Sequence, residues 1–212
     1  MRATETEDEA ASMSKAENLA SKKVGVLALQ GDFEAHSAAI ARAGATPVLV
    51  RKPEDLENIA GLVIPGGEST TMLKLLREEG MFELLAEFGR KRPIFGTCAG
   101  AILMAREVTH PAQQSLGLMD LSVERNGYGR QIDSRITRLD PDAEFHERTA
   151  PGDLEAVFIR APIIRHVGPQ ARVLASYEGD PVLVEQGRHL VATFHPELTP
   201  DSRVHRLFIS KL

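Results

Sequence analysis

The sequence is poor in cysteine and in aromatic residues. It has one cysteine, Cys98, and no tryptophan among 212 residues. A single cysteine excludes an intramolecular disulfide framework and every zinc site built from several cysteines. With 5% aromatic residues, the base-stacking surfaces of single-strand nucleic-acid binders are not expected. A lone thiol that must stay reduced suits the cytoplasm, so we expect a cytoplasmic protein.

The chain also lacks an excess of positive charge and any long apolar run. Its formal net charge is −5, which gives no basic field to hold nucleic acid or an anionic membrane. Apolar runs such as 24–29 are far shorter than the roughly 18 residues of a spanning helix. We therefore expect no nucleic-acid partner and no membrane span. The 42% of hydrophobic residues is enough for a full globular core.

Hydrophobic patterning divides the chain at about residue 23. Residues 1–22 are polar, acidic and rich in alanine, and we expect a disordered N-terminal extension, with a docking helix as the alternative. The rest, 23–212, is expected to form one domain. Its first half alternates apolar strand patterns with helical patterns. The predicted strands are 24–30, 46–50, 61–64 and 93–96, and the predicted helices are 33–43, 69–79, 82–88 and 99–107.

The second half is richer in short β patterns separated by Gly, Pro and Asp. Predicted strands cover 118–125, 131–139, 156–160, 173–177, 182–186 and 189–194, and 201–211 is predicted to be a closing helix. Together the halves predict an α/β fold with a mostly parallel central sheet and antiparallel additions in the C-terminal half.

The strongest chemical signal is Gly96-Thr97-Cys98-Ala99-Gly100, between a predicted strand and a predicted helix. A nucleophile elbow needs small residues two positions before and after the nucleophile, because the turn is tight. The helix N-terminus would favour the thiolate of Cys98. The alternative is a buried structural cysteine beside a glycine-rich turn.

A thiol nucleophile needs a base, and His195 is the best candidate. It follows an apolar strand, and Glu197 two residues later would project to the same side and orient the imidazole. A strand-end turn with surface charges is the alternative. The other histidines considered are His36, His110, His146, His166, His189 and His205.

Pro65-Gly66-Gly67-Glu68-Ser69 also ends an apolar strand and opens a helix. Two glycines allow backbone N–H groups to face an oxyanion. A plain tight turn remains open, as does a phosphate cradle, although Glu68 would repel phosphate.

These motifs together resemble the class I, triad-type glutamine amidotransferases, and most closely the glutaminase subunits of pyridoxal 5′-phosphate synthases. The matching stretches are LQGD (29–32), PGGESTTM (65–72), FGTCAG (95–100), VERNGYGRQIDS (123–134), VFIRAP (157–162) and FHPELT (194–199). The resemblance implies a flavodoxin-like three-layer sandwich. It also implies hydrolysis of L-glutamine to glutamate and ammonia, with delivery of ammonia to a partner synthase in vitamin B6 biosynthesis.

The resemblance assigns roles by position. Cys98, His195 and Glu197 match the catalytic triad, and Gly66, Gly67 and Ala99 match the oxyanion hole. The positions implied to bind L-glutamine are Gly67, Glu68, Ser69, Arg125, Ile159 and Arg160, and Gln30 is implied to lie at the ammonia exit. No metal and no organic cofactor is implied. A γ-glutamyl hydrolase or cysteine peptidase on the same scaffold, or a catalytically silent binding subunit, remains the alternative.

Overall fold

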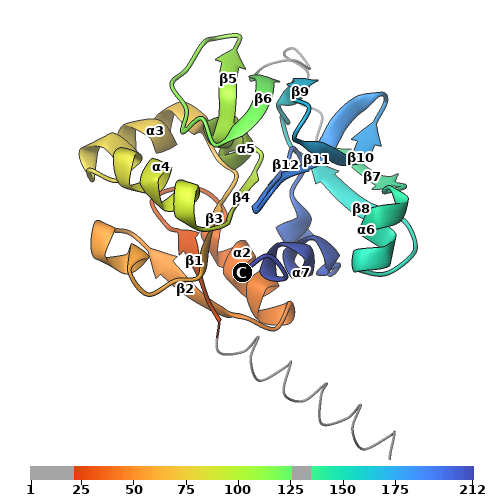
Figure 1. Ribbon diagram of the computed structural model, residues 1–212, viewed down its shortest axis with the longest axis horizontal. Helices are drawn as coiled ribbons and strands as arrows, with labels where there is room; N and C mark the ends of the chain where they lie inside the picture. The colour runs from red at the N-terminus through yellow and green to blue at the C-terminus, as the bar shows by residue number, and fades with distance from the viewer. Residues whose placement is uncertain (1–21, 126–134) are drawn as a thin grey trace, which may run out of the picture.

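Five parallel strands form the centre of the computed structural model, which describes residues 22–125 and 135–212 (Figure 1). Their bounds are β1 (Lys23–Leu27), β2 (Thr46–Val50), β3 (Gly61–Ile64), β4 (Ile94–Thr97) and β12 (His189–Ala192). Their order is β2-β1-β3-β4-β12. Apart from the edge strand β2, their residues are almost all buried, as expected of strands covered on both faces.

Two further strands extend this sheet in the antiparallel sense. β11 (Asp180–Gln186) pairs with β12, and β10 (Arg172–Tyr177) pairs with β11. Counting β12 as the fifth parallel strand gives the order 2-1-3-4-5 of flavodoxin-like sheets. The predicted fold class, with antiparallel additions in the C-terminal half, is therefore confirmed.

Helices cover both faces of the sheet (Figure 1). α2 (Phe33–Arg42) and α7 (Arg203–Ile209) lie side by side on one face, where Val63 packs in the same apolar cluster as Ile40 and Phe208. α3 (Ser69–Glu78), α4 (Phe82–Lys91) and α5 (Ala99–Met104) contribute to the opposite cluster, with Leu62 and Ile64. Successive residues of β3 thus point to opposite layers, which is the alternation of a central strand.

Smaller elements surround the sandwich. β5 (Ala105–Thr109), β6 (Met119–Glu124) and β9 (Ile163–Val167) form a three-stranded sheet. β7 (Arg135–Leu139) and β8 (Leu154–Phe158) form an antiparallel pair. α6 (Ala143–Arg148) lies between them in the chain, and two 3-10 helices are η1 (Pro53–Leu56) and η2 (Pro196–Leu198).

The predicted helix over 99–107 is wrong in its second part. α5 ends at Met104, and the chain continues as β5 in parallel pairing with β6. Ala105 turns to extended backbone, and this long-range pairing overrides the helical pattern of the apolar run. β9 and α6 were not predicted. Part of the predicted strand 131–139 and all of the expected N-terminal extension except Lys22 lie outside the described residues.

Within residues 22–125 and 135–212, no helix has the length and apolar character needed to cross a bilayer.

Candidate active site

Cys98 lies on a sharp turn between β4 and α5. Its backbone has φ 47° and ψ −103°, a region that residues other than glycine rarely adopt. Its N–H donates to the carbonyl of Ala192 at 2.8 Å, which fixes the turn against β12. A Cβ at Gly100 would lie 2.2 Å from the Ile64 carbonyl oxygen, so α5 can approach β3 only without a side chain there. The turn therefore holds the thiol at the carboxyl end of the sheet.

His195 and Glu197 follow β12 at the same edge of the sheet. His195 Nδ1 lies 2.7 Å from Glu197 Oε1, and both residues are about 4% exposed. The His195 N–H donates to the Val157 carbonyl at 2.8 Å, which anchors the backbone. Because a proton shared at Nδ1 serves Glu197, Nε2 is left for the thiol.

The electrostatics favour an ion pair. Burial lowers the pKa of His195, but the hydrogen bonds with Cys98 and Glu197 outweigh burial and raise this pKa to about 10. Burial raises the pKa of Glu197, while its contacts with His36 and His195 bring it well below its usual range. A protonated imidazole between the sulfur and the carboxylate is therefore the stable arrangement.

The Gly66–Gly67 turn borders these groups. A Cβ at Gly66 would lie 2.5 Å from His195 Cε1 and 3.3 Å from Cys98 Cβ. Gly67 has φ 145°, and a Cβ there would lie 2.6 Å from the side-chain amide of Gln30. Gln30 Oε1 accepts from the Glu68 N–H at 3.1 Å. The turn is thus held by Gln30 on one side and faces the thiol and imidazole on the other, while Ala99 opens α5 directly after Cys98.

Glu68 and Arg125 carry opposite charges on one wall of the site. Glu68 caps α3 by accepting from the N–H groups of Thr70 and Thr71. Burial raises its pKa, but these hydrogen bonds prevail and lower the pKa to about 2. Arg125 donates to Thr70 Oγ1 at 2.8 Å and lies 3.4 Å from Glu68 Oε1. An ionised carboxylate and a guanidinium are therefore fixed side by side.

A pocket of about 270 Å³ joins these groups, just below the size range of typical small-molecule sites. It is lined by Asp32, Gly67, Glu68, Ser69, Cys98, Ile102, Arg125, Ile159, Arg160 and His195. The structure thus brings together the sequence-predicted nucleophile, base and glutamine-binding positions. Gln30, Gly66, Ala99 and Glu197 lie beside the pocket or behind it.

Asp32 and Ile102 line the pocket but were not assigned from the sequence. Ile102 lies one helical turn after Cys98, a spacing that could have found it. Asp32 follows β1 at the edge where ligands of open α/β sheets bind, which is a weaker signal.

Comparison with known proteins identifies the family. Residues 26–212 match the model of the SNO glutamine amidotransferase family. The chain belongs to this family. A protein of Solibacter usitatus, named "Pyridoxal 5′-phosphate synthase subunit PdxT", is 70% identical over 191 residues, covering 90% of this chain and all of that protein. Its namesake in Koribacter versatilis is 56% identical, covering 88% of this chain and 94% of that protein.

A solved structure agrees with the family assignment. The crystal structure of a glutamine amidotransferase superposes with a TM-score of 0.81 at 44% identity, covering 89% of this chain and 97% of that one.

The described part of this amidotransferase contains one group of side chains that could together approach a metal ion. Asp32, His195 and Glu197 offer ligand atoms within 4.8 Å of one another. However, His195 Nδ1 and Glu197 Oε1 already share a hydrogen bond. A metal at this place would displace the proton that orients the imidazole, so the donor set fits a catalytic triad better than a metal centre.

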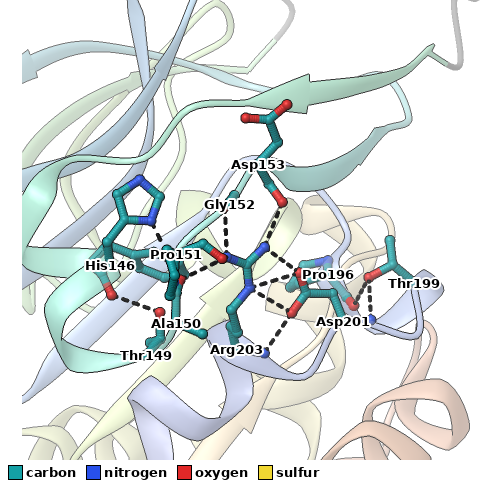
Figure 2. A network of polar contacts seen from close by, with 11 residues as sticks. His146, Thr149, Ala150, Pro151, Gly152, Asp153, Pro196, Thr199, Asp201 and Arg203 are labelled. Carbon is teal, nitrogen blue, oxygen red and sulfur yellow. Dashed lines mark hydrogen bonds and ion pairs between the residues drawn. The ribbon is translucent and has the colours of Figure 1, made fainter.

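Arg203 anchors the segment that follows Glu197. Its guanidinium donates to the carbonyls of Ala150, Gly152 and Asp153 in the loop before β8, at 3.0, 2.7 and 2.6 Å (Figure 2). It also forms a two-nitrogen contact with Asp201, and its side chain is 12% exposed. Figure 2 shows the arginine reaching from α7 to the loop, so one side chain ties the two segments together.

An Arg203→Lys variant is expected to lower the free energy of unfolding by about 2 kcal/mol, because an ammonium cannot replace a planar fork of charged hydrogen bonds. Denaturant unfolding should show a lower midpoint with an unchanged slope. Arg206→Lys, on the exposed side of the same helix, is the matched control and should unfold as the wild type does. Equal midpoints for the two variants would contradict the anchoring role.

Proposed function

We propose that this amidotransferase hydrolyses L-glutamine to L-glutamate and ammonia and delivers the ammonia to a partner synthase that makes pyridoxal 5′-phosphate. The observation that supports it best is the alignment of a strained, pocket-lining Cys98 with the buried His195–Glu197 pair. The match over the full length of the Solibacter usitatus PdxT protein supports the same partner and product.

In the proposed reaction the Cys98 thiolate attacks the side-chain amide carbon of glutamine. Backbone N–H groups of Gly67 and Ala99, with Gly66 completing the turn, stabilise the tetrahedral oxyanion, each donor contributing roughly 3 kcal/mol. The His195 imidazolium gives its proton to the departing nitrogen, which leaves as ammonia. The same imidazole then takes a proton from water, which hydrolyses the thioester and releases glutamate.

The pocket wall suits the charges of a free amino acid. Arg125 and Arg160 offer cations for the α-carboxylate, and Glu68 offers an anion for the α-ammonium group. Ser69 and Ile159 border the rest of the chain of glutamine. We assign these side chains and Gly67 as the glutamine-binding set.

Gln30 is proposed to lie at the ammonia exit. It contacts the Gly67 position and the Glu68 N–H from behind the oxyanion turn, on the side away from the thiol. Ammonia must reach its acceptor before bulk water protonates it, so the partner is expected to dock over this side. The proposed compartment is the cytoplasm, where a lone catalytic thiol stays reduced.

The test compares ammonia release from L-glutamine with hydrolysis of γ-glutamyl dipeptides, each with and without the cognate synthase. We expect glutamine to be the preferred substrate and the partner to raise its turnover. Faster hydrolysis of the dipeptides, independent of the partner, would favour a γ-glutamyl hydrolase or peptidase. No hydrolysis of either substrate in the complex would indicate a silent binding subunit.

A further inference from the structure

Two fully buried histidines stand behind the triad, on the side away from the pocket. His36 in α2 and His205 in α7 are both 0% exposed. His36 Nε2 lies 3.4 Å from Glu197 Oε2 and 2.9 Å from Thr97 Oγ1. His36 Nδ1 lies 3.1 Å from His205 Nε2. We call His36 and His205 the histidine pair.

One ring nitrogen of His36 thus contacts both arms of the active site. Thr97 is the last residue of β4 and directly precedes Cys98, while Glu197 orients His195. Oε2 of Glu197 is buried without a hydrogen-bond partner among the described residues, and His36 Nε2 contacts it at 3.4 Å. The His36 ring therefore connects β4, which leads directly to Cys98, with the carboxylate of Glu197.

The hydrogen-bond partners of the two histidine rings determine where their protons lie. Burial lowers the pKa of His205 to about 3, so its ring is neutral. Its Nδ1 is buried without a hydrogen-bond partner among the described residues, and an unpaired acceptor there costs less than an unpaired N–H. The proton is therefore on Nε2 and is donated to His36 Nδ1. His36 must then carry its own proton on Nε2, facing Glu197 and Thr97.

The histidine pair is held rigidly. Phe95 of β4 meets the His36 ring edge-on at 6.2 Å and the His205 ring at 5.6 Å between centroids. A side chain locked in this way can fix the direction of a hydrogen bond to its neighbour.

We propose that His36, supported by His205, is a positioning residue that holds the outer oxygen of Glu197 and couples it to the nucleophile strand through Thr97. The proposal rests on the triad assigned above. His36 does not line the pocket, so it acts on the chemistry through Glu197 and leaves glutamine binding to other groups.

Removing His36 should move the acid limb of the pH–activity profile to higher pH. The charged or titratable groups that face Glu197 are His195, His36 and Asp32, with His205 behind His36 and Arg42 beyond it. Without His36, the carboxylate of Glu197 loses the polar ring nitrogen that lies 3.4 Å from its Oε2, and it becomes protonated at a higher pH. A protonated Glu197 no longer stabilises the imidazolium, and the thiolate is lost with it.

The experiment uses His36→Leu, His36→Gln and His205→Leu in complex with the synthase. Two profiles are measured against pH: kcat/KM for glutamine, and the rate of Cys98 alkylation by iodoacetamide. Because Cys98 is the only cysteine, alkylation reports the thiolate without any turnover. His189→Leu is the matched control, since His189 is also buried but accepts from the Ile94 N–H at the other end of β12.

For His36→Leu we expect the acid limb of both profiles to move up by about one pH unit, with an unchanged KM and about tenfold lower kcat at the acid side. His36→Gln should return the acid limb most of the way to its wild-type position, because the glutamine amide N–H can reach Glu197. His205→Leu should shift the limb less, and it provides the test if His36→Leu does not fold. His189→Leu should lose stability with no shift.

Acid limbs at the wild-type position in His36→Leu or His205→Leu, or a His36→Gln variant that behaves as His36→Leu, would overturn the proposal. Failure of the proposed function is distinguishable, because the wild-type complex would then not release ammonia from glutamine. The alkylation profiles would still test the role of His36 in that event.

Discussion

A Cys98→Ala variant is expected to release ammonia from glutamine at least about 10⁴-fold more slowly than the wild type, because no other described side chain in the pocket can form the thioester. The loss should appear in kcat, measured with the synthase present and glutamine in excess. Alanine fits the buried position of Cys98, which is 7% exposed, so the fold should persist.

Ammonium salts provide the control for this variant. Added directly, they should restore pyridoxal phosphate formation by the complex, because the synthase then needs no glutaminase. Glutamine-dependent synthesis at the wild-type rate in Cys98→Ala would contradict the assignment of Cys98 as nucleophile. Loss of the ammonium-supported reaction would instead mean that the variant disturbs the complex.

The sequence predicted the sheet well because local patterns coincide with its topology. Apolar runs such as 61–64, which Pro65 follows directly, are short and alternate with helical patterns. The elbow at Cys98 was recognisable because a tight turn and a close helix both require glycines at fixed spacing. Such features leave a signal within a few residues of chain.

Features that depend on distant partners were missed or misread. The strand at Ala105–Thr109 forms against β6, and nothing in its own apolar pattern marks the end of the helix at Met104. The contact of His36 with Glu197 joins residues on α2 and η2 that are brought together by packing across one face of the sheet. A single sequence contains no local pattern for such a contact.

Adding a single methyl group at Gly31 should strongly lower the rate of glutamine hydrolysis. Gly31 has φ 94°, and a Cβ there would lie 1.8 Å from the carbonyl oxygen of Gly66. That contact is with backbone, so the Gly66–Gly67 peptide itself must shift. Two adjacent glycines allow this peptide to rotate at little cost in conformational energy. We therefore hypothesise that its rotation is the switch by which the partner controls activity. A methyl group at Gly31 would bias the peptide away from its present orientation.

Gly31→Ala is therefore expected to lower kcat for glutamine by about 10²-fold or more, the loss typical of one misplaced oxyanion donor. Gly44→Ala is the matched control, because Gly44 has φ 95° and a Cβ there would meet nothing within 4 Å. Gly44→Ala should lose about 1–2 kcal/mol of stability from the left-handed backbone. Gly31→Ala should lose more, because its Cβ also meets the Gly66 backbone. Unfolding in denaturant measures these costs, and ammonia release in the complex measures the difference in activity. Equal activity of the two variants would mean that the position of the Gly66 carbonyl does not control the oxyanion hole.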